Sequence, residues 1–167
     1  RDRAPPAAPT VTGITPSSGG TAGGTAVTIS GTNFTGATAV SIGGVAATSV
    51  AIVNSTTITA ITPAHAAGVV NVSVTTPGGA GSGLGLFTYV APPVPSVLGI
   101  TPSSGSTAGG TAVTITGANF TGATSVLIGG IAATSVTIVN ATTITATTGA
   151  HAVGAVDVVV NGPGGTG

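Results

Sequence analysis

The sequence predicts an all-β protein in which one antiparallel, two-sheet sandwich is used twice in tandem. Residues 14–81 repeat without a gap at residues 100–167, so that Ile100 is the counterpart of Ile14. Each copy holds about seven short Val-, Ile- and Thr-rich segments, with Gly, Pro and Ser turns at roughly ten-residue spacing. No segment shows helical periodicity. Strands of this length and spacing are typical of a sandwich.

The expected domain organisation follows from the repeat and from two proline-rich stretches. Residues 1–10 and 91–97 are rich in Pro and Ala, and such segments form extended, semi-rigid linkers. We therefore expect a first domain at residues 11–90 and a second at residues 98–167.

The first half of domain one contains three expected strands. Residues 11–14 begin the first, which ends in a turn at residues 15–20, where proline fixes φ and glycine permits positive φ. Residues 25–31 alternate, with Val27 and Ile29 on one face. Residues 38–42 place Val40 and Ile42 inward, and a Gly-Gly pair then turns the chain.

The second half contains four more expected strands, at residues 46–53, 56–62, 69–76 and 84–90. The third of these puts Val70, Val72 and Val74 on one face. A Pro-Gly-Gly turn follows it. The last strand brings Phe87 and Tyr89 to the same face, where they should fill the core.

Charge is almost absent from the chain, which excludes several classes of function. The ionised side chains are Arg1, Asp2, Arg3 and Asp157, and there is no Lys. Binding to nucleic acid needs several cations to neutralise phosphates, so we expect no nucleic-acid partner. A polybasic membrane patch is excluded for the same reason. Mean hydropathy is +0.67, but no run approaches the ~18 apolar residues of a spanning helix, so we expect no membrane insertion.

The titratable side chains do not form a recognisable catalytic or metal site. His65 and His151 occupy equivalent loops without acidic or Cys partners, and the chain has no Cys, so we interpret them as loop-packing residues rather than metal ligands. Asp157, expected within a strand, has no second carboxylate nearby for acid-base catalysis. No G-x-S-x-G motif or orienting acid accompanies either His. We expect no catalytic residue, no metal ligand and no cofactor.

Three further patterns have simple structural explanations. The Gly pairs lack the Lys and the following helix of a phosphate-binding loop, and are expected to be turns. The N-x-[ST] matches fit chance in a Thr-rich chain, at Asn33, Asn54, Asn71, Asn119 and Asn140. Asn33 and Asn119 are expected in turns, with Phe34 and Phe120 closing the sandwich. Tyr89 should be in the core, which leaves no aromatic platform for a sugar.

The order of motifs resembles one domain family. The first copy reads ITPSSG, GGTAVTISGTNF, VSIGGVAA, TTITAITPAHAAGVVNVSVTTPGG and LFTYV. This order resembles the IPT/TIG family of immunoglobulin-like domains over residues 11–90, and the second copy resembles it over residues 98–167. The resemblance implies an immunoglobulin-like sandwich. Domains of this family occur in bacterial surface and secreted proteins, in phage structural proteins, beside the catalytic domains of secreted glycan-degrading enzymes, and in animal receptors and transcription factors. The transcription-factor branch holds DNA with basic loops, which this chain lacks.

The second copy departs from the first at its end. The counterpart of residues 84–90 would begin at about residue 170, beyond Gly167, so domain two lacks its last strand. An empty place would expose a sheet edge and the core. The chain is expected to continue within a longer parent protein with further domains; the alternative is a partner strand added by β-augmentation. The absence of an initiator Met and of a signal peptide also favours a fragment or a processed chain.

These observations favour a non-catalytic structural or interaction module. It would act as a spacer or decoration on a bacterial surface or a phage particle, or would mediate multivalent adhesion there. The expected location is therefore extracellular, at the cell surface or on a virion. Its expected partners are proteins of that assembly, and cell-surface glycans are a further candidate. The alternative is an accessory spacer or weak carbohydrate-binding region of a secreted polysaccharide-acting enzyme.

Overall fold

A computed structural model describes residues 4–167, which form seventeen strands and no helix. The chain divides into two compact units, with the boundary between Ala91 and Pro92. The all-β fold expected from the sequence is confirmed. Among these residues no helix is long and apolar enough to cross a membrane.

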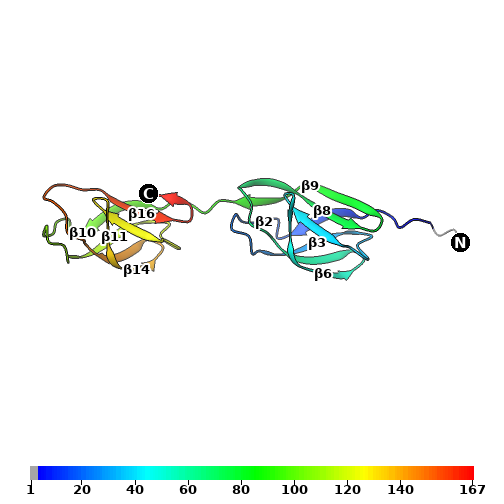
Figure 1. The fold of residues 1–167 in the computed structure, drawn as a ribbon, viewed down its shortest axis with the longest axis horizontal. Helices are drawn as coiled ribbons and strands as arrows, with labels where there is room; N and C mark the ends of the chain where they lie inside the picture. Colours follow the sequence, from blue (N-terminus) through cyan, green and yellow to red (C-terminus); the bar gives the residue numbers. More distant parts are fainter. Residues whose placement is uncertain (1–3) are drawn as a thin grey trace. The chain divides into compact units, whose positions relative to one another are not determined.

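Unit 1 is a sandwich of two sheets (Figure 1). The first has the order β1-β3-β7-β6 and the second the order β2-β9-β8-β4-β5. The strands are β1 (Thr10–Thr15), β2 (Ser18–Gly20), β3 (Ala26–Thr32), β4 (Ala39–Ile42), β5 (Val45–Ala46), β6 (Thr48–Asn54), β7 (Thr57–Ile61), β8 (Gly68–Thr76) and β9 (Gly79–Val90). All pairings are antiparallel except that of β2 with β9, which is parallel.

The core of unit 1 lies between the sheets and follows the alternation of the sequence. On β3 the side chains of Val27 and Ile29 are buried, while the alternating Thr28 and Ser30 are exposed. β4 and β8 contribute further buried aliphatic side chains, as expected. Phe87 and Tyr89 of β9 are both buried, with ring centroids 5.1 Å apart in an edge-to-face arrangement. Such pairs contribute about 0.5–1.5 kcal/mol beyond their burial.

Two segments of unit 1 differ from the sequence prediction. Residues 18–20, expected to be a turn, form β2 because the end of β9 lies beside them: Thr88 N donates to Ser17 O at 2.9 Å. Residues 46–53, expected to be one strand, belong to two. β5 pairs with β4, the chain then changes sheets at Ala47, and β6 pairs with β7. A bulge at Ser49, with φ of 50°, accommodates this change.

Unit 2 repeats this arrangement over fewer strands. Its sheets have the orders β10-β11-β15-β14 and β13-β12-β16-β17. The strands are β10 (Ser96–Thr101), β11 (Ala112–Ala118), β12 (Ser125–Ile128), β13 (Ile131–Ala132), β14 (Thr134–Asn140), β15 (Thr143–Thr147), β16 (Val158–Gly162) and β17 (Gly165–Thr166). The buried core is smaller than in unit 1, and its single aromatic side chain is Phe120.

The proline-rich segment before each unit lies against that unit. Ala8 O accepts a hydrogen bond from Asn33 Nδ2, and Val94 O accepts one from Asn119 Nδ2, both at 3.1 Å. Both Asn residues have φ of 60°, consistent with the predicted turns. A side chain at Gly78 would collide with the carbonyl oxygen of Ala7. The segment and its unit are therefore packed closely together.

Candidate functional site

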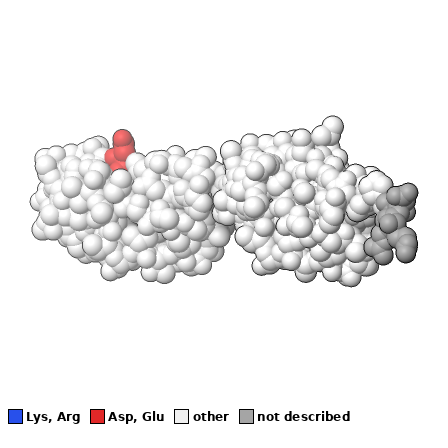
Figure 2. Space-filling model, turned by 45° about the vertical axis from the view of Figure 1, so that its right-hand side comes forward, with Lys and Arg blue, Asp and Glu red and all other residues white. Residues whose placement is uncertain are grey.

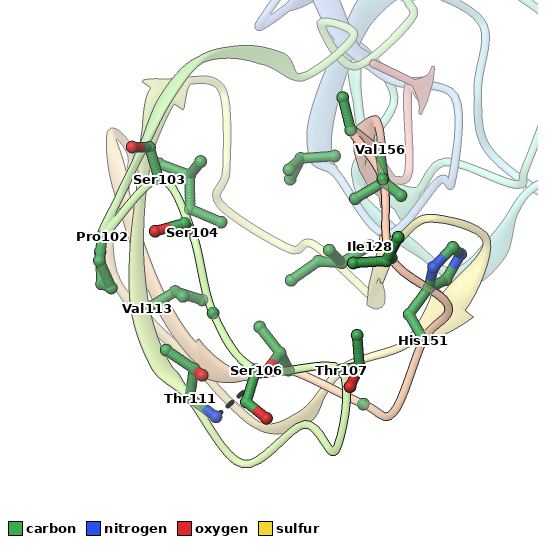
Figure 3. A pocket seen from close by; sticks show the side chains of 18 of the residues that line it. Pro102, Ser103, Ser104, Ser106, Thr107, Thr111, Val113, Ile128, His151 and Val156 are labelled. Carbon is green, nitrogen blue, oxygen red and sulfur yellow. Dashed lines mark hydrogen bonds between the residues drawn. The ribbon is translucent and has the colours of Figure 1, made fainter.

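A groove of about 350 Å³ opens on unit 2 (Figure 3). Residues 102–107 form one wall, and residues 151–156 form another with His151 at its end. Ile128 and Val158 line its apolar part. Its chemistry combines neutral hydroxyl groups, backbone amides and aliphatic side chains.

In unit 1 the corresponding space is filled by the end of β9. Tyr89 stacks on His65, the counterpart of His151, with ring centroids 5.0 Å apart and planes 18° apart. The Tyr89 hydroxyl donates to Pro63 O at 2.8 Å. Phe87 lies against Gly19, where an added Cβ would be 3.0 Å from its Cζ atom. The groove is therefore the place that two aromatic side chains occupy in the other copy.

The aliphatic side chains around this space are more exposed in unit 2 than in unit 1. Ile42 and Val72 of unit 1 are fully buried. Their counterparts Ile128 and Val158 are only partly buried, although the residue types are the same. The groove therefore leaves apolar surface accessible that the same fold covers in unit 1, and burial of such surface is favourable.

Backbone pairing is also missing around the groove. In unit 1, β9 pairs with residues 18–20 on one side and with residues 68–70 on the other. The counterparts, residues 104–106 and 154–156, are in no strand. Asp157, expected within a strand, instead precedes β16 and is exposed. That expectation was wrong because the strand needed to pair with this segment is absent from the residues described.

Each His side chain lies between a carbonyl oxygen of its own loop and one of a Gly-Gly turn 22 residues earlier. His65 has Nδ1 at 2.8 Å from Ala66 O and Nε2 at 3.1 Å from Gly43 O. His151 makes the matching contacts at 2.7 and 3.2 Å. Carbonyl oxygens thus lie beside all four ring nitrogens. Residues 4–167 contain no cluster of three or more His, Cys, Asp or Glu side chains that could hold a metal ion.

The remaining candidate residues have structural partners. Asn54 and Asn140 each accept two hydrogen bonds through Oδ1, from the backbone and the hydroxyl of the Thr two residues later. Asn71 Oδ1 accepts from Gly85 N at 2.8 Å. Burial raises the pKa of the Tyr89 phenol above its ordinary value, and a hydrogen bond involving Thr62 partly opposes this effect.

The surface is nearly free of charge. Asp157 is the only ionisable acid or base other than His and Tyr within residues 4–167, and it is the single red group on the face drawn in Figure 2. Every Phe and Tyr ring of the chain is buried, namely Phe34, Phe87, Tyr89 and Phe120. The exposed surface therefore offers hydroxyl, amide, backbone and aliphatic groups.

Comparison with solved structures gave several matches, each of which covers only part of the other chain. The chain is 21% identical to the plexin A4 extracellular region, with a TM-score of 0.45, covering 93% of this chain and 15% of that one. It is 23% identical to SGBP-B from a complex xyloglucan utilization locus in Bacteroides uniformis, with a TM-score of 0.43, covering 95% of this chain and 47% of that one. For PbSGBP-B of Prevotella bryantii the values are 20%, 0.42, 98% and 42%. This chain thus spans less than half the length of each.

Comparison with curated proteins gave no match. The family model of the IPT/TIG domain matches the chain twice, at residues 9–89 and at residues 95–167. These two segments cover most of the sequence and correspond to the two sandwiches described above. The chain therefore belongs to the IPT/TIG domain family, with two tandem copies.

Proposed function

We propose that the chain is a non-catalytic pair of immunoglobulin-like modules that spaces or presents parts of an extracellular assembly, on a bacterial surface or a phage particle. The observation that carries this proposal is the chemistry of its surface. Every Phe and Tyr ring is buried, and one carboxylate is the only formal charge expected at neutral pH within residues 4–167. Such a surface offers neither the charges nor the aromatic faces that anchor strong single-site binding.

Weak contacts on this surface become useful when they are repeated. The strands β6 and β14 are exposed along their whole lengths and present the related sequences TSVAIVN and TSVTIVN. Val53 and Val139, for example, are 59% and 57% exposed. Many copies on one particle would convert such modest contacts into firm attachment, because linked binding events raise avidity by about 10²–10⁴.

The test compares the free chain with beads carrying it at high density. The probes are surfaces coated with peptidoglycan, with xyloglucan, or with the chain itself. We expect the coated beads to be retained on at least one surface, and the free chain to wash off at micromolar concentration. Retention should change little with salt, because almost no charge is present to be screened. Matched beads carrying the Val53→Lys variant test whether β6 contributes.

Three results would contradict the proposal. Turnover of a polysaccharide by the purified chain would show catalysis. Tight binding of one soluble sugar by the free chain would instead favour the alternative role, an accessory carbohydrate-binding region of a secreted polysaccharide-acting enzyme. Failure of the beads on all surfaces would leave no multivalent contact to support an adhesive role.

A further inference from the structure

We propose that Asn54 and Asn140 are acceptor sites for N-linked glycosylation of the folded chain. The sugar would come from a lipid-linked oligosaccharide diphosphate and be transferred to the side-chain amide nitrogen by an oligosaccharyltransferase. The Thr-rich composition explains why five N-x-[ST] matches occur, but the structure separates two of them from the other three. This inference goes beyond the surface contacts proposed above, and it does not depend on them.

The Asn54 and Asn140 triplets lie in equivalent exposed turns of the two units. Asn54 ends β6 and is followed by the turn residues Ser55 and Thr56, and Asn140 ends β14 in the same way. All three residues of each triplet are exposed. Both β6 and β14 are edge strands of their sheets (Figure 1). An enzyme can therefore reach each whole triplet without moving a core residue, as is expected of an acceptor on a surface loop.

The other three triplets are anchored in the fold. Their middle residues are fully buried, namely Phe34, Val72 and Phe120. The Nδ2 atoms of Asn33 and Asn119 already donate to backbone carbonyl oxygens. Asn71 belongs to β8, which pairs with β4 on one side and with β9 on the other. A transferase that binds one of these triplets would have to withdraw an apolar side chain from the core, which is unfavourable.

The hydrogen bonds of the exposed triplets leave the amide nitrogen available. Asn54 Oδ1 accepts from Thr56 N and from Thr56 Oγ1, both at 2.9 Å. Asn140 Oδ1 accepts the same pair of hydrogen bonds from Thr142, also at 2.9 Å. These bonds direct the oxygen of each amide into its turn. The nitrogen is then the group of each side chain that can react with a sugar.

The transfer balances without an oxidant or a reductant. Nδ2 attacks the anomeric carbon of the donor sugar, so that a C–N bond forms while the C–O bond to the diphosphate breaks. The lipid diphosphate leaves with the electron pair, and one Nδ2 proton passes to a base of the transferase. Negative charge grows on Oδ1 as that proton is lost, and the two hydrogen bonds from the threonine stabilise it.

The probe is a dolichyl diphosphate-linked oligosaccharide, used with a single-subunit oligosaccharyltransferase that requires only the N-x-[ST] triplet. The folded 167-residue chain is the acceptor, and intact mass spectrometry counts the sugars that are attached. We expect two glycans per chain. Asn54→Gln and Asn140→Gln should each remove one glycan, whereas the matched control Asn71→Gln should keep both.

Two substitutions of Thr56 separate its hydroxyl group from the shape of the turn. Thr56→Val keeps the size of the side chain but removes the hydroxyl, so modification of Asn54 should slow by about tenfold or more. Thr56→Ser keeps the hydroxyl and should retain most of the rate. Both variants should fold because Thr56 is exposed, and modification of Asn140 is the internal control in each.

Free peptides test whether the fold selects the sites. Synthetic peptides of residues 29–38, 50–59 and 67–76 contain Asn33, Asn54 and Asn71 respectively. All three peptides should accept the sugar, since none of them has a core in which the middle residue could be buried. In the folded chain only the triplet of the second peptide should react.

Several outcomes would overturn the proposal. It is wrong if the folded chain gains no sugar, whether or not the free peptides are modified. It is also wrong if Asn33, Asn71 or Asn119 of the folded chain is modified as fast as Asn54, or if Thr56→Val reacts like the parent chain. Failure of the coated beads to attach would contradict the proposed function and would leave these acceptor sites unaffected.

Discussion

Replacing Phe87 by Ala should remove a large part of the stability of unit 1. Phe87 is fully buried and its ring lies edge-to-face with Tyr89 at 5.1 Å. Removal of a buried Phe side chain costs about 3–5 kcal/mol. A domain of some 80 residues has a free energy of unfolding of about 4–12 kcal/mol, at roughly 0.05–0.15 kcal/mol per residue. The variant should therefore lose at least about a quarter of the free energy of unfolding.

The sole tyrosine of the chain provides the assay. Tyr89 lies in unit 1 and there is no Trp, so tyrosine fluorescence during urea unfolding reports on this unit. With an m-value of about 1–3 kcal/mol per M, a loss of about 4 kcal/mol lowers the midpoint by about 1–4 M. The m-value itself should be nearly unchanged if both states keep their compactness.

A matched substitution on the same strand is the control. Leu84 also belongs to β9, but its side chain is 76% exposed. Leu84→Ala should change the free energy of unfolding by no more than about 0.5 kcal/mol. If Phe87→Ala costs less than about 1 kcal/mol, or if both variants lose the same amount, the aromatic pair does not close the core as described.

Three other predictions concern single side chains. Burial raises the Tyr89 pKa, so the neutral phenol favours the folded state. Unit 1 should keep its full stability below pH 10.0 and lose stability as pH rises through the folded-state pKa. Urea titrations at alkaline pH should show no such loss in Tyr89→Phe, which lacks the ionising group. Asn33→Ala places a left-handed φ of 60° on Ala and should cost about 1–2 kcal/mol, against a smaller loss for Asn33→Gly, as measured by calorimetry. His65→Ala removes a ring stacked on tyrosine and should lower the melting temperature of unit 1, whereas His151→Ala, with no ring stacked on it, should lower that of unit 2 less; equal losses would contradict the role of stacking.

Alternation in the sequence was enough to predict the central strands. Val27 and Ile29 on β3, and Phe87 with Tyr89 on β9, are buried as the period of two required. Each of these strands pairs with a neighbour on both edges, so alternate side chains point either into the core or to the outer face of the sheet. The fold class and the burial of the aromatic pair therefore follow from local pattern.

The differences all depend on contacts between distant residues. Residues 18–20 are a strand only because residues 88–90 lie beside them, and the local Pro and Gly residues favoured a turn. Ala47 separates two strands because the chain changes sheets there, which alternation cannot reveal. Asp157 lies outside a strand because pairing, rather than β-propensity, defines one.

The groove was partly foreseeable. The repeat showed that residues 98–167 do not include a counterpart of residues 84–90, but it did not identify the residues that line the groove. His151 was assigned to loop packing, which its carbonyl contacts support, and its place at the end of the groove depends on the stacking of His65 in the other copy. That role could have been found only by comparing the two copies in three dimensions.

The nearly uncharged surface has a consequence for resistance to digestion. Proteases of trypsin specificity cut after Lys or Arg, and this chain has no Lys and only Arg1 and Arg3. Susceptibility to proteolysis ordinarily follows how often a domain opens. Here even a fully unfolded domain would present no such site after residue 3. Cleavage by these proteases beyond that residue would therefore not depend on the free energy of unfolding.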